Sequence, residues 1–255
     1  MGSVKIKSSE EIDKLRIAGK ITANVLEQVS KEAVEGITTA ELDKFADKLV
    51  RGYGAEPVFV GYRGYRHATC ISINHEVVHG IPGEKVLCDG DIVSIDIGVK
   101  INGYCGDSAV TVPVGKASTK VQKLLRVGKN SLRGAIKQAR AGNHLGDIAY
   151  ATQREAEKHG YSVVRELYGH GIGRELHEDP LIPNFGRPGE GIVLKPGMVF
   201  AIEPMVNIGG WRVKTLSDGW TVVTEDGSLS CHFEHMVLIT EGEPEVLTLW
   251  QKKKM

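Results

Sequence analysis

Several features that mark other classes of protein are absent from this 255-residue sequence. No two of its four cysteines form a CxxC pair, so neither a disulfide framework nor a cysteine zinc site is indicated. No apolar run approaches the roughly 18 residues that span a bilayer, and residues 1–20 contain no signal-peptide core. Basic and acidic residues both number 32, so no net charge attracts nucleic acid or an anionic membrane. We therefore expect a soluble, cytoplasmic protein with reduced thiols and with neither nucleic acid nor membrane as a partner.

One motif in the sequence allows two interpretations, a metal-binding helix or a strand. Residues 74–83, NHEVVHGIPG, contain an HExxH pattern formed by His75, Glu76 and His79. In a zincin metalloprotease the two histidines lie one turn apart on a helix and hold a zinc ion. Here an alternating β-branched run precedes the pattern, and a proline and two glycines follow it, so we expect a strand and not a helix. We interpret the pattern as accidental.

The pattern of elements predicts an α+β fold. With 41% hydrophobic and 25% charged residues, the chain can form a substantial core, and we expect a single domain over residues 1–255. Apolar residues recur at helical spacing in four segments, at 8–30, after Thr38-Thr39, near 118–140 and at 145–159. Strand signals cluster at 70–79, 91–99, 104–112, 198–206, 211–215, 220–224 and 232–240. Helices followed by strands, twice over, indicate two similar halves, at about 1–117 and 118–255.

Comparison of the sequence with itself supports this division. Residues 87–96, LCDGDIVSID, align with residues 194–203, LKPGMVFAIE, and each segment ends in a carboxylate. A His-Gly-Ile triplet precedes each one, at 79–81 and at 170–172. Short apolar strands can resemble one another by chance, but here the polar end-points recur as well, which favours a degenerate duplication.

Two aspartates are predicted to lie together on a hairpin. Asn102-Gly103 is the strongest two-residue hairpin signal, and it places Asp107 opposite Gly98. Asp96 is two residues from Gly98 on the same face, so the two carboxylates are diagonal neighbours, roughly 7 to 8 Å apart at the backbone. Carboxylates that close repel each other unless a proton or a cation lies between them. A metal ion is the economical explanation.

A second set of polar residues lies in or beside apolar segments. Glu203 ends the run at 198–202, Glu234 lies within the run at 231–239, and His170 is flanked by glycines that allow a close approach. Taken singly, each acid could be a cap and the histidine an ordinary hydrogen-bonded residue. Four carboxylates together are too much negative charge for one cation, whereas two divalent ions would balance it. The glycines do not complete a dinucleotide motif, because position 174 is Arg.

At these residues the chain resembles the type I methionine aminopeptidases of peptidase family M24, from about Ile6 to about Leu249. The motifs that carry the resemblance are Gly61 to Tyr65, Asn74 to Pro82, the Asp96-to-Asp107 hairpin, Gly169 to Gly173, Ile202 to Pro204, Trp220 to Thr224 and Phe233 to His235. The resemblance implies the pita-bread fold, with two pseudo-twofold halves around a central antiparallel sheet. It also implies metal-dependent removal of the initiator methionine from nascent proteins and peptides, with a small second residue preferred. The chain's own start, Met1-Gly2-Ser3, fits that preference.

The resemblance assigns roles to individual residues. The ligands of two divalent ions, Co, Mn, Fe or Zn, would be Asp96, Asp107, His170, Glu203 and Glu234. Glu203 would also be the acid/base, His79 would contact the substrate backbone, and His177 would stabilise the tetrahedral intermediate. With His79 and His177, the substrate site would comprise Phe59, Tyr62, Tyr65, Cys70, Leu176 and Trp220, an apolar and aromatic lining suited to a thioether. The resemblance further implies a monomer that acts on N-terminal peptides and associates transiently with the ribosome.

The sequence departs from the family pattern at Phe59, at Leu176 and at Cys231-His232, where Ala-Gln is common. Phe59 stands where many relatives have a small Cys, and Leu176 replaces the usual Phe, so the strictness of methionine selectivity stays open. His232 stands where Gln is common, and its spacing from Glu234 predicts that both side chains face the same side. We interpret His232 as a residue that tunes a metal ligand and not as a ligand itself.

Two alternatives with the same fold remain. An X-Pro aminopeptidase or a prolidase shares the metal site but usually carries a large additional N-terminal domain, for which 255 residues leave no space. A non-catalytic pita-bread binding module would be expected to have lost metal ligands, and none is lost here.

Overall fold

A computed structural model of the chain describes residues 4–250, so the proposed substrate-like start Met1-Gly2-Ser3 lies outside the described residues. The helices are α1 (Ser9–Glu32), α2 (Thr39–Gly52), α3 (Thr119–Gln138) and α4 (Leu145–Glu157), with a 3-10 turn η1 at Tyr62–Gly64. All four predicted helices are therefore confirmed, with ends within about two residues of the expected ones. None of the helices in residues 4–250 is long and apolar enough to cross a membrane.

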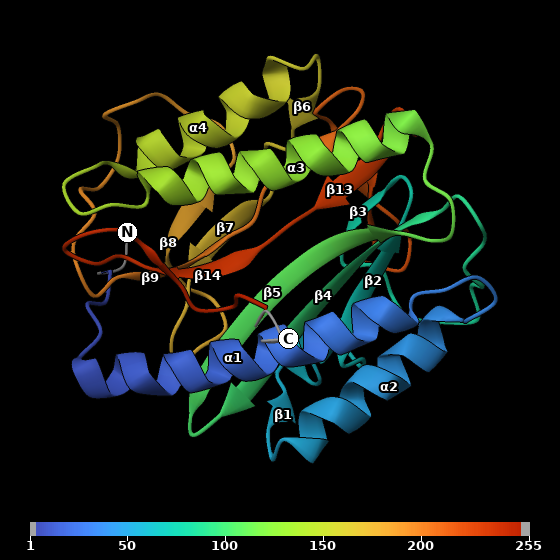
Figure 1. Cartoon of the computed structure of the whole chain (residues 1–255), viewed down its shortest axis with the longest axis horizontal. Helices are drawn as coiled ribbons and strands as arrows, with labels where there is room; N and C mark the ends of the chain where they lie inside the picture. The colour runs from blue at the N-terminus through green and yellow to red at the C-terminus, as the bar shows by residue number, and fades with distance from the viewer. Residues whose placement is uncertain (1–3, 251–255) are drawn as a thin grey trace, which may run out of the picture.

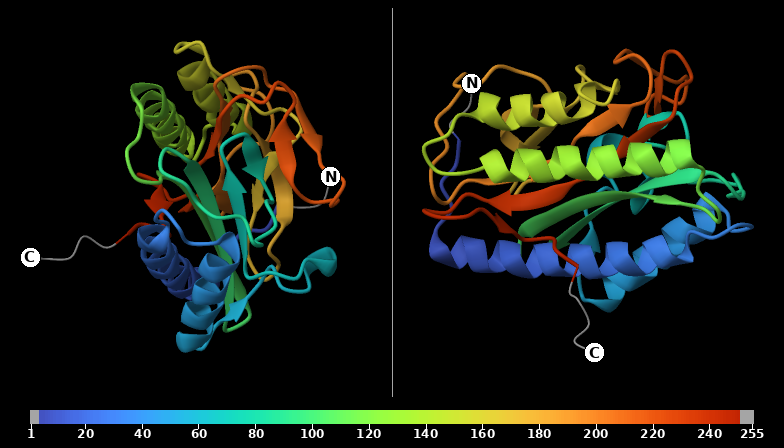
Figure 2. Two further views of the ribbon diagram at one scale, coloured as in Figure 1. Left: turned by 90° about the vertical axis from the view of Figure 1, so that its right-hand side faces the viewer. Right: turned by 45° about the horizontal axis from the view of Figure 1, so that its top comes forward.

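Capping explains where the first two helices begin. The side chains of Ser8 and Thr38 each accept a hydrogen bond from the N–H of the third residue of the helix, and the carboxylates of Glu11 and Glu41 accept one from the cap N–H. The helices form two pairs, α1 with α2 and α3 with α4, at opposite edges of the strands (Figure 1). The left view of Figure 2 shows that the helices lie on one side of the strands. In that view none of the four described helices covers the opposite face of the strands.

The strands are mostly short and antiparallel. They are β1 (Glu56–Pro57), β2 (Thr69–Ile73), β3 (Glu76–Val78), β4 (Ile92–Ile101), β5 (Tyr104–Pro113), β6 (Ser162–Val163), β7 (Tyr168–Gly171), β8 (Glu178–Pro183), β9 (Val199–Ile202), β10 (Met205–Asn207), β11 (Val213–Thr215), β12 (Val222–Thr224), β13 (Ser230–His232), β14 (His235–Leu238) and β15 (Glu245–Val246). Their hydrogen bonds divide them into four sheets, of which β1-β4-β2 with β5 and β15-β14-β9-β7-β8 are the largest.

The β4–β5 hairpin has the predicted register. Ile101 pairs with Tyr104 across the Asn102-Gly103 turn, and both turn residues have positive φ. Gly98 consequently pairs with Asp107, as the turn signal predicted. Because side chains alternate along a strand, this register places Asp96 and Asp107 on one face of the hairpin.

The two self-similar segments occupy equivalent places in the fold. Gly90 and Gly197 both have positive φ, at 91° and 87°, and each turns the chain into a buried strand, β4 or β9. Residue 86 bridges to Thr38 before α2, and residue 193 bridges to His144 before α4. The same helix-entry contact thus accompanies each segment, which is what a duplication predicts.

Three of the predicted strands were too long. The predicted strands at 70–79, 198–206 and 232–240 are each interrupted, at Asn74-His75, at Glu203-Pro204 and at Phe233-Glu234. Asn74 has a φ of 59°, which a strand does not allow, and Pro204 has no backbone N–H for a ladder. These interruptions place Glu203 and Glu234 at strand ends, where a side chain can turn into a cavity.

Candidate metal centre and substrate pocket

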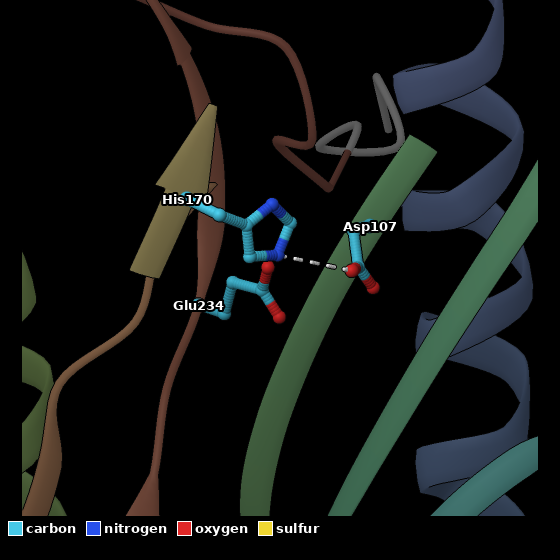
Figure 3. A group of neighbouring side chains, drawn as sticks. All are labelled: Asp107, His170 and Glu234. Atoms are coloured by element: carbon cyan, nitrogen blue, oxygen red, sulfur yellow. Dashed lines mark ion pairs between the residues drawn. The ribbon is translucent and has the colours of Figure 1, made fainter. Parts of the chain in front are cut away.

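Three buried side chains from distant parts of the chain meet at one point. Asp107 lies on β5, His170 on β7, and Glu234 in the link between β13 and β14 (Figure 3). One potential ligand atom from each of them lies within 4.8 Å of the other two. His170 Nε2 is 3.7 Å from Asp107 Oδ2, and His170 Nδ1 is 3.0 Å from the Gly171 carbonyl oxygen. Nδ1 therefore carries a proton to donate, which leaves the Nε2 lone pair free to bind a metal.

Asp96 and Glu203 extend this group on two sides. Glu203 Oε1 is 3.6 Å from His170 Nε2. The hairpin register places Asp96 on the same face as Asp107. Burial raises the pKa of Asp107, and the negative charge of Asp96 raises it further. Four carboxylates and an imidazole thus converge, as the sequence predicted.

The electrostatics of the group fit divalent cations. Burial raises the pKa of all four carboxyl groups. Among the described residues, Oδ1 of Asp96, Oδ1 of Asp107 and Oε1 of Glu234 are buried without a hydrogen-bond partner, although buried polar atoms are normally paired. Oxygen donors of this kind with one imidazole suit Mn, Fe, Co or Zn. The donor set therefore fits the metal ions that the sequence implied.

Two further histidines border the group. Burial lowers the pKa of His79 and of His177 to about 4, so both are neutral at pH 7. The His177 ring lies 4.3 Å from the His170 ring and 5.1 Å from that of Tyr62, measured between centroids. Neutral imidazoles in these places can donate or accept a hydrogen bond to a bound substrate.

Close backbone packing explains the glycine in each copy of the His-Gly-Ile triplet. A Cβ on Gly80 would lie 2.2 Å from the Ile71 carbonyl oxygen, and one on Gly171 would lie 2.2 Å from that of Asp179. Only glycine allows such a close approach of two backbones. In both halves the glycine lets the chain approach a neighbouring strand, and the preceding histidine, His79 or His170, lines the same cavity.

A cavity of about 320 Å³ contains the whole group. Its apolar wall is formed largely by aromatic side chains, with Tyr65 and Trp220 in edge contact at 4.9 Å between centroids. Phe59 rests on Gly98, since a Cβ there would lie 2.5 Å from Phe59 Cε1. Phe59 of the apolar wall and the β4–β5 hairpin are therefore in direct contact.

The structure brings all thirteen predicted site residues into the lining of this cavity. They are Phe59, Tyr62, Tyr65, Cys70, His79, Asp96, Asp107, His170, Leu176, His177, Glu203, Trp220 and Glu234. Sequence reasoning missed two lining residues, Arg63 and Leu181. Arg63 lies between two predicted tyrosines, so its position could have been inferred, whereas the exposed Leu181 carries no signal of its own.

The HExxH pattern has a structural explanation. His75 is exposed in a turn and Glu76 begins strand β3, so no zincin helix exists, as predicted. The Glu76 carboxylate is buried, accepts a hydrogen bond of 2.7 Å from the Ile73 N–H and pairs with Lys85 Nζ at 2.5 Å. Glu76 therefore holds the β2–β3 turn.

Comparisons with known proteins agree with this site. The profile of metallopeptidase family M24 matches residues 13–241. Methionine aminopeptidase 1 of Bacillus subtilis is 52% identical over 242 residues, which are 95% of this chain and 98% of that protein. The methionine aminopeptidase crystal structure from Thermotoga maritima has a TM-score of 0.95 at 47% identity, covering 97% of this chain and 100% of that one.

A longer protein shares the fold. The prolidase from Pyrococcus furiosus matches with a TM-score of 0.79 at 26% identity, over 97% of this chain and 66% of that chain. These similarities confirm the predicted α+β pita-bread fold.

Proposed function

The chain belongs to metallopeptidase family M24, and from that premise we propose that it removes the initiator methionine from nascent proteins and peptides, preferring a small second residue. The observation that carries the proposal is the meeting of a metal-binding group and an apolar, aromatic pocket in one cavity. A thioether is apolar and polarizable, so such a lining suits methionine. The prolidase-like activity and the binding-module alternative are not favoured.

Dependence on divalent metal follows from the family, and we propose two ions of Co, Mn, Fe or Zn. Their ligands would be Asp96, Asp107, His170, Glu203 and Glu234. When bound, the ions lower the pKa of water and polarise the scissile carbonyl.

Side chains of this chain would transfer the proton and hydrogen-bond the substrate. Glu203 would take a proton from the attacking water and pass it to the leaving amine. His79 would hydrogen-bond the substrate backbone, and His177 would donate to the oxyanion as it develops. A free α-amino group meeting the carboxylates would restrict the enzyme to chain ends.

The site also suggests how the enzyme meets its substrates. All the proposed ligands and pocket residues come from one chain, which supports a monomer as the active form. Because initiator methionine is removed from chains during synthesis, we propose that the enzyme works in the cytoplasm with a transient ribosome contact.

Peptide cleavage by the chelator-stripped protein tests this function. We expect free methionine from Met-Ala-Ser when Co²⁺ or Mn²⁺ is restored, and none without metal. Leu-Ala-Ser and N-acetylated Met-Ala-Ser are the controls, and neither should be cleaved at a comparable rate. Metal binding without cleavage of any peptide would refute the proposal and favour a binding module, whereas cleavage of an X-Pro peptide alone would favour a prolidase-like enzyme.

Pocket selectivity gives a separate prediction. Phe59→Ala removes the side chain that rests on Gly98, so the pocket should hold methionine less closely. We expect kcat/KM for Met-Ala-Ser to fall by roughly 10- to 200-fold, with a smaller fall for Leu-Ala-Ser, so that the preference for methionine narrows. Paired kinetics on the two peptides measure this ratio. An unchanged ratio would mean that Phe59 does not contact the substrate side chain.

A further inference from the structure

His232 is a buried imidazole that the resemblance assigns neither to the metal ligands nor to the substrate pocket. It is only 2% exposed, and its Nε2 has no hydrogen-bond partner within residues 4–250. The nearest charged atom is Glu203 Oε2, at 3.4 Å, and no other carboxylate in residues 4–250 lies within 4 Å of its ring nitrogens. A buried unpaired nitrogen is costly, so its position beside the proposed acid/base requires an explanation.

The main chain of His232 is fixed from two sides. Its N–H donates to Thr111 Oγ1 at 2.8 Å, and its carbonyl accepts from the same hydroxyl at 2.8 Å. The residue also pairs with Met205 between β13 and β10, and the next N–H, of Phe233, donates to the Pro204 carbonyl. These contacts hold His232 against the segment that carries Glu203.

Glu203 lies between two imidazoles. Its Oε1 faces His170 Nε2 at 3.6 Å, and its Oε2 faces His232 Nε2 at 3.4 Å. His170 Nε2 also lies 3.7 Å from Asp107 Oδ2, whereas no carboxylate other than that of Glu203 in residues 4–250 lies within 4 Å of a His232 ring nitrogen. The two histidines are therefore not equivalent, and the geometry favours His232 as a hydrogen-bond donor and not as a metal ligand.

We propose that His232 is a positioning residue that donates an Nε2–H hydrogen bond to Oε2 of Glu203. The separation needs to shorten by only a few tenths of an ångström to reach the usual N–H···O length of about 2.9 Å. The bond holds one carboxylate oxygen, so that the other keeps its direction toward His170 and the metal-binding group. This inference rests on the proposed function, because it assumes that Glu203 is a ligand and moves the proton.

A pair of amide substitutions tests the geometry of the bond. In His232→Gln the amide nitrogen falls near the place of Nε2 and can still donate to Glu203. In His232→Asn it falls near the place of Nδ1, one atom short, and cannot reach. Both variants keep a polar amide in the same buried place, so they differ mainly in this one bond.

Steady-state kinetics on Met-Ala-Ser with Mn²⁺ and calorimetric titration with Mn²⁺ are the two readouts. We expect His232→Gln to stay within about threefold of the parent protein, and His232→Asn to lose about 10- to 100-fold in kcat and about tenfold in Mn²⁺ affinity. KM should change by less than about threefold, since His232 is not among the residues that line the cavity. Thermal melting confirms that each variant is folded, and His232→Met replaces the Asn variant if that one does not fold.

Equal kcat and equal Mn²⁺ affinity in the two amide variants would overturn the proposal, whether the shared values are high or low. A rise in KM with kcat unchanged would overturn it too, because His232 would then be a substrate contact. Cleavage of Met-Ala-Ser by the parent protein is measured first, so failure of the proposed function is seen separately. The calorimetric comparison does not depend on cleavage.

Discussion

Glu203→Gln is expected to lower kcat for methionine release by about 10²- to 10⁴-fold. The amide cannot accept the proton of the attacking water, and it replaces a charged oxygen in the metal-binding group with a neutral one. Steady-state kinetics with saturating Mn²⁺ measures the loss. A variant that keeps more than about a tenth of the parent kcat would show that another group moves the proton.

Glu76→Gln is the matched control, because it makes the same chemical change at the centre of the HExxH pattern. Glu76 pairs with Lys85 and accepts the Ile73 N–H, but it does not line the cavity. We expect near-normal kcat and a free energy of unfolding lower by about 1 to 3 kcal/mol, the cost of weakening a buried charged interaction. Loss of activity in this variant with Glu203→Gln still active would restore the zincin interpretation.

The substitutions Glu203→Gln and Glu76→Gln are expected to rank in the opposite order for stability and for activity. Desolvation raises the pKa of Glu203, as it does for Asp96, Asp107 and Glu234, so the ionised form of Glu203 is unfavourable in the folded chain without metal. Replacing it with a neutral amide should leave the melting temperature of the metal-free protein unchanged or higher. The variant that destroys activity is thus expected to be the more stable of the pair.

The hairpin shows why part of the site could be predicted. Asn-Gly turns allow few registers, so Asn102-Gly103 alone fixed the pairing of Gly98 with Asp107 and the shared face of Asp96 and Asp107. The starts of α1 and α2 could also be predicted, because Ser8 and Thr38 cap these helices through hydrogen bonds with residues three positions away. Interactions confined to a few neighbouring residues can be read from a sequence.

The remaining parts of the site depend on contacts between distant segments. His170 lies on β7, a strand that was not predicted because two of its four residues are glycine, which weakens the strand signal. The interruptions at Glu203-Pro204 and Phe233-Glu234 were missed because apolar residues continue on both sides. The convergence of β5, β7 and the β13–β14 link was predicted from the acids and the histidine in or beside apolar segments and from the resemblance, since no local rule brings residues 107, 170 and 234 together.

Removing the metal ions should abolish activity and also make stability depend on pH in a particular way. Without metal, burial raises the pKa of Asp96, Asp107, Glu203 and Glu234, so the folded chain binds more protons at these groups than the unfolded chain. Stability then falls as pH rises from about 4, the usual carboxyl value, through the raised values.

The buried histidines act in the opposite direction but over a lower range. Burial lowers the pKa of His79 and His177 to about 4 and that of His170 to about 3, so the unfolded chain binds more protons below about pH 6.5. Their contribution to stability therefore rises with pH and is complete above about 6.5. Below about pH 6.5 the carboxyl groups and the histidines change stability in opposite directions. Above about pH 6.5, of these two sets of groups, only the carboxyl groups still change stability.

The melting temperature of the chelated protein should therefore fall between about pH 6.5 and 8.5, with each carboxyl group still protonated in the folded state contributing up to about 1.4 kcal/mol per pH unit. Saturating Mn²⁺ should raise the melting temperature and remove most of this slope, because the cations replace the protons; binding at 100 times Kd stabilises by about 2.7 kcal/mol. Calorimetric melting at three pH values, with chelator and with Mn²⁺, measures both effects. A flat or rising melting temperature in the chelated protein would mean that the four carboxyl groups are not crowded enough to need metal. A shallower slope in Glu203→Gln would identify Glu203 as one of the groups that the ions neutralise.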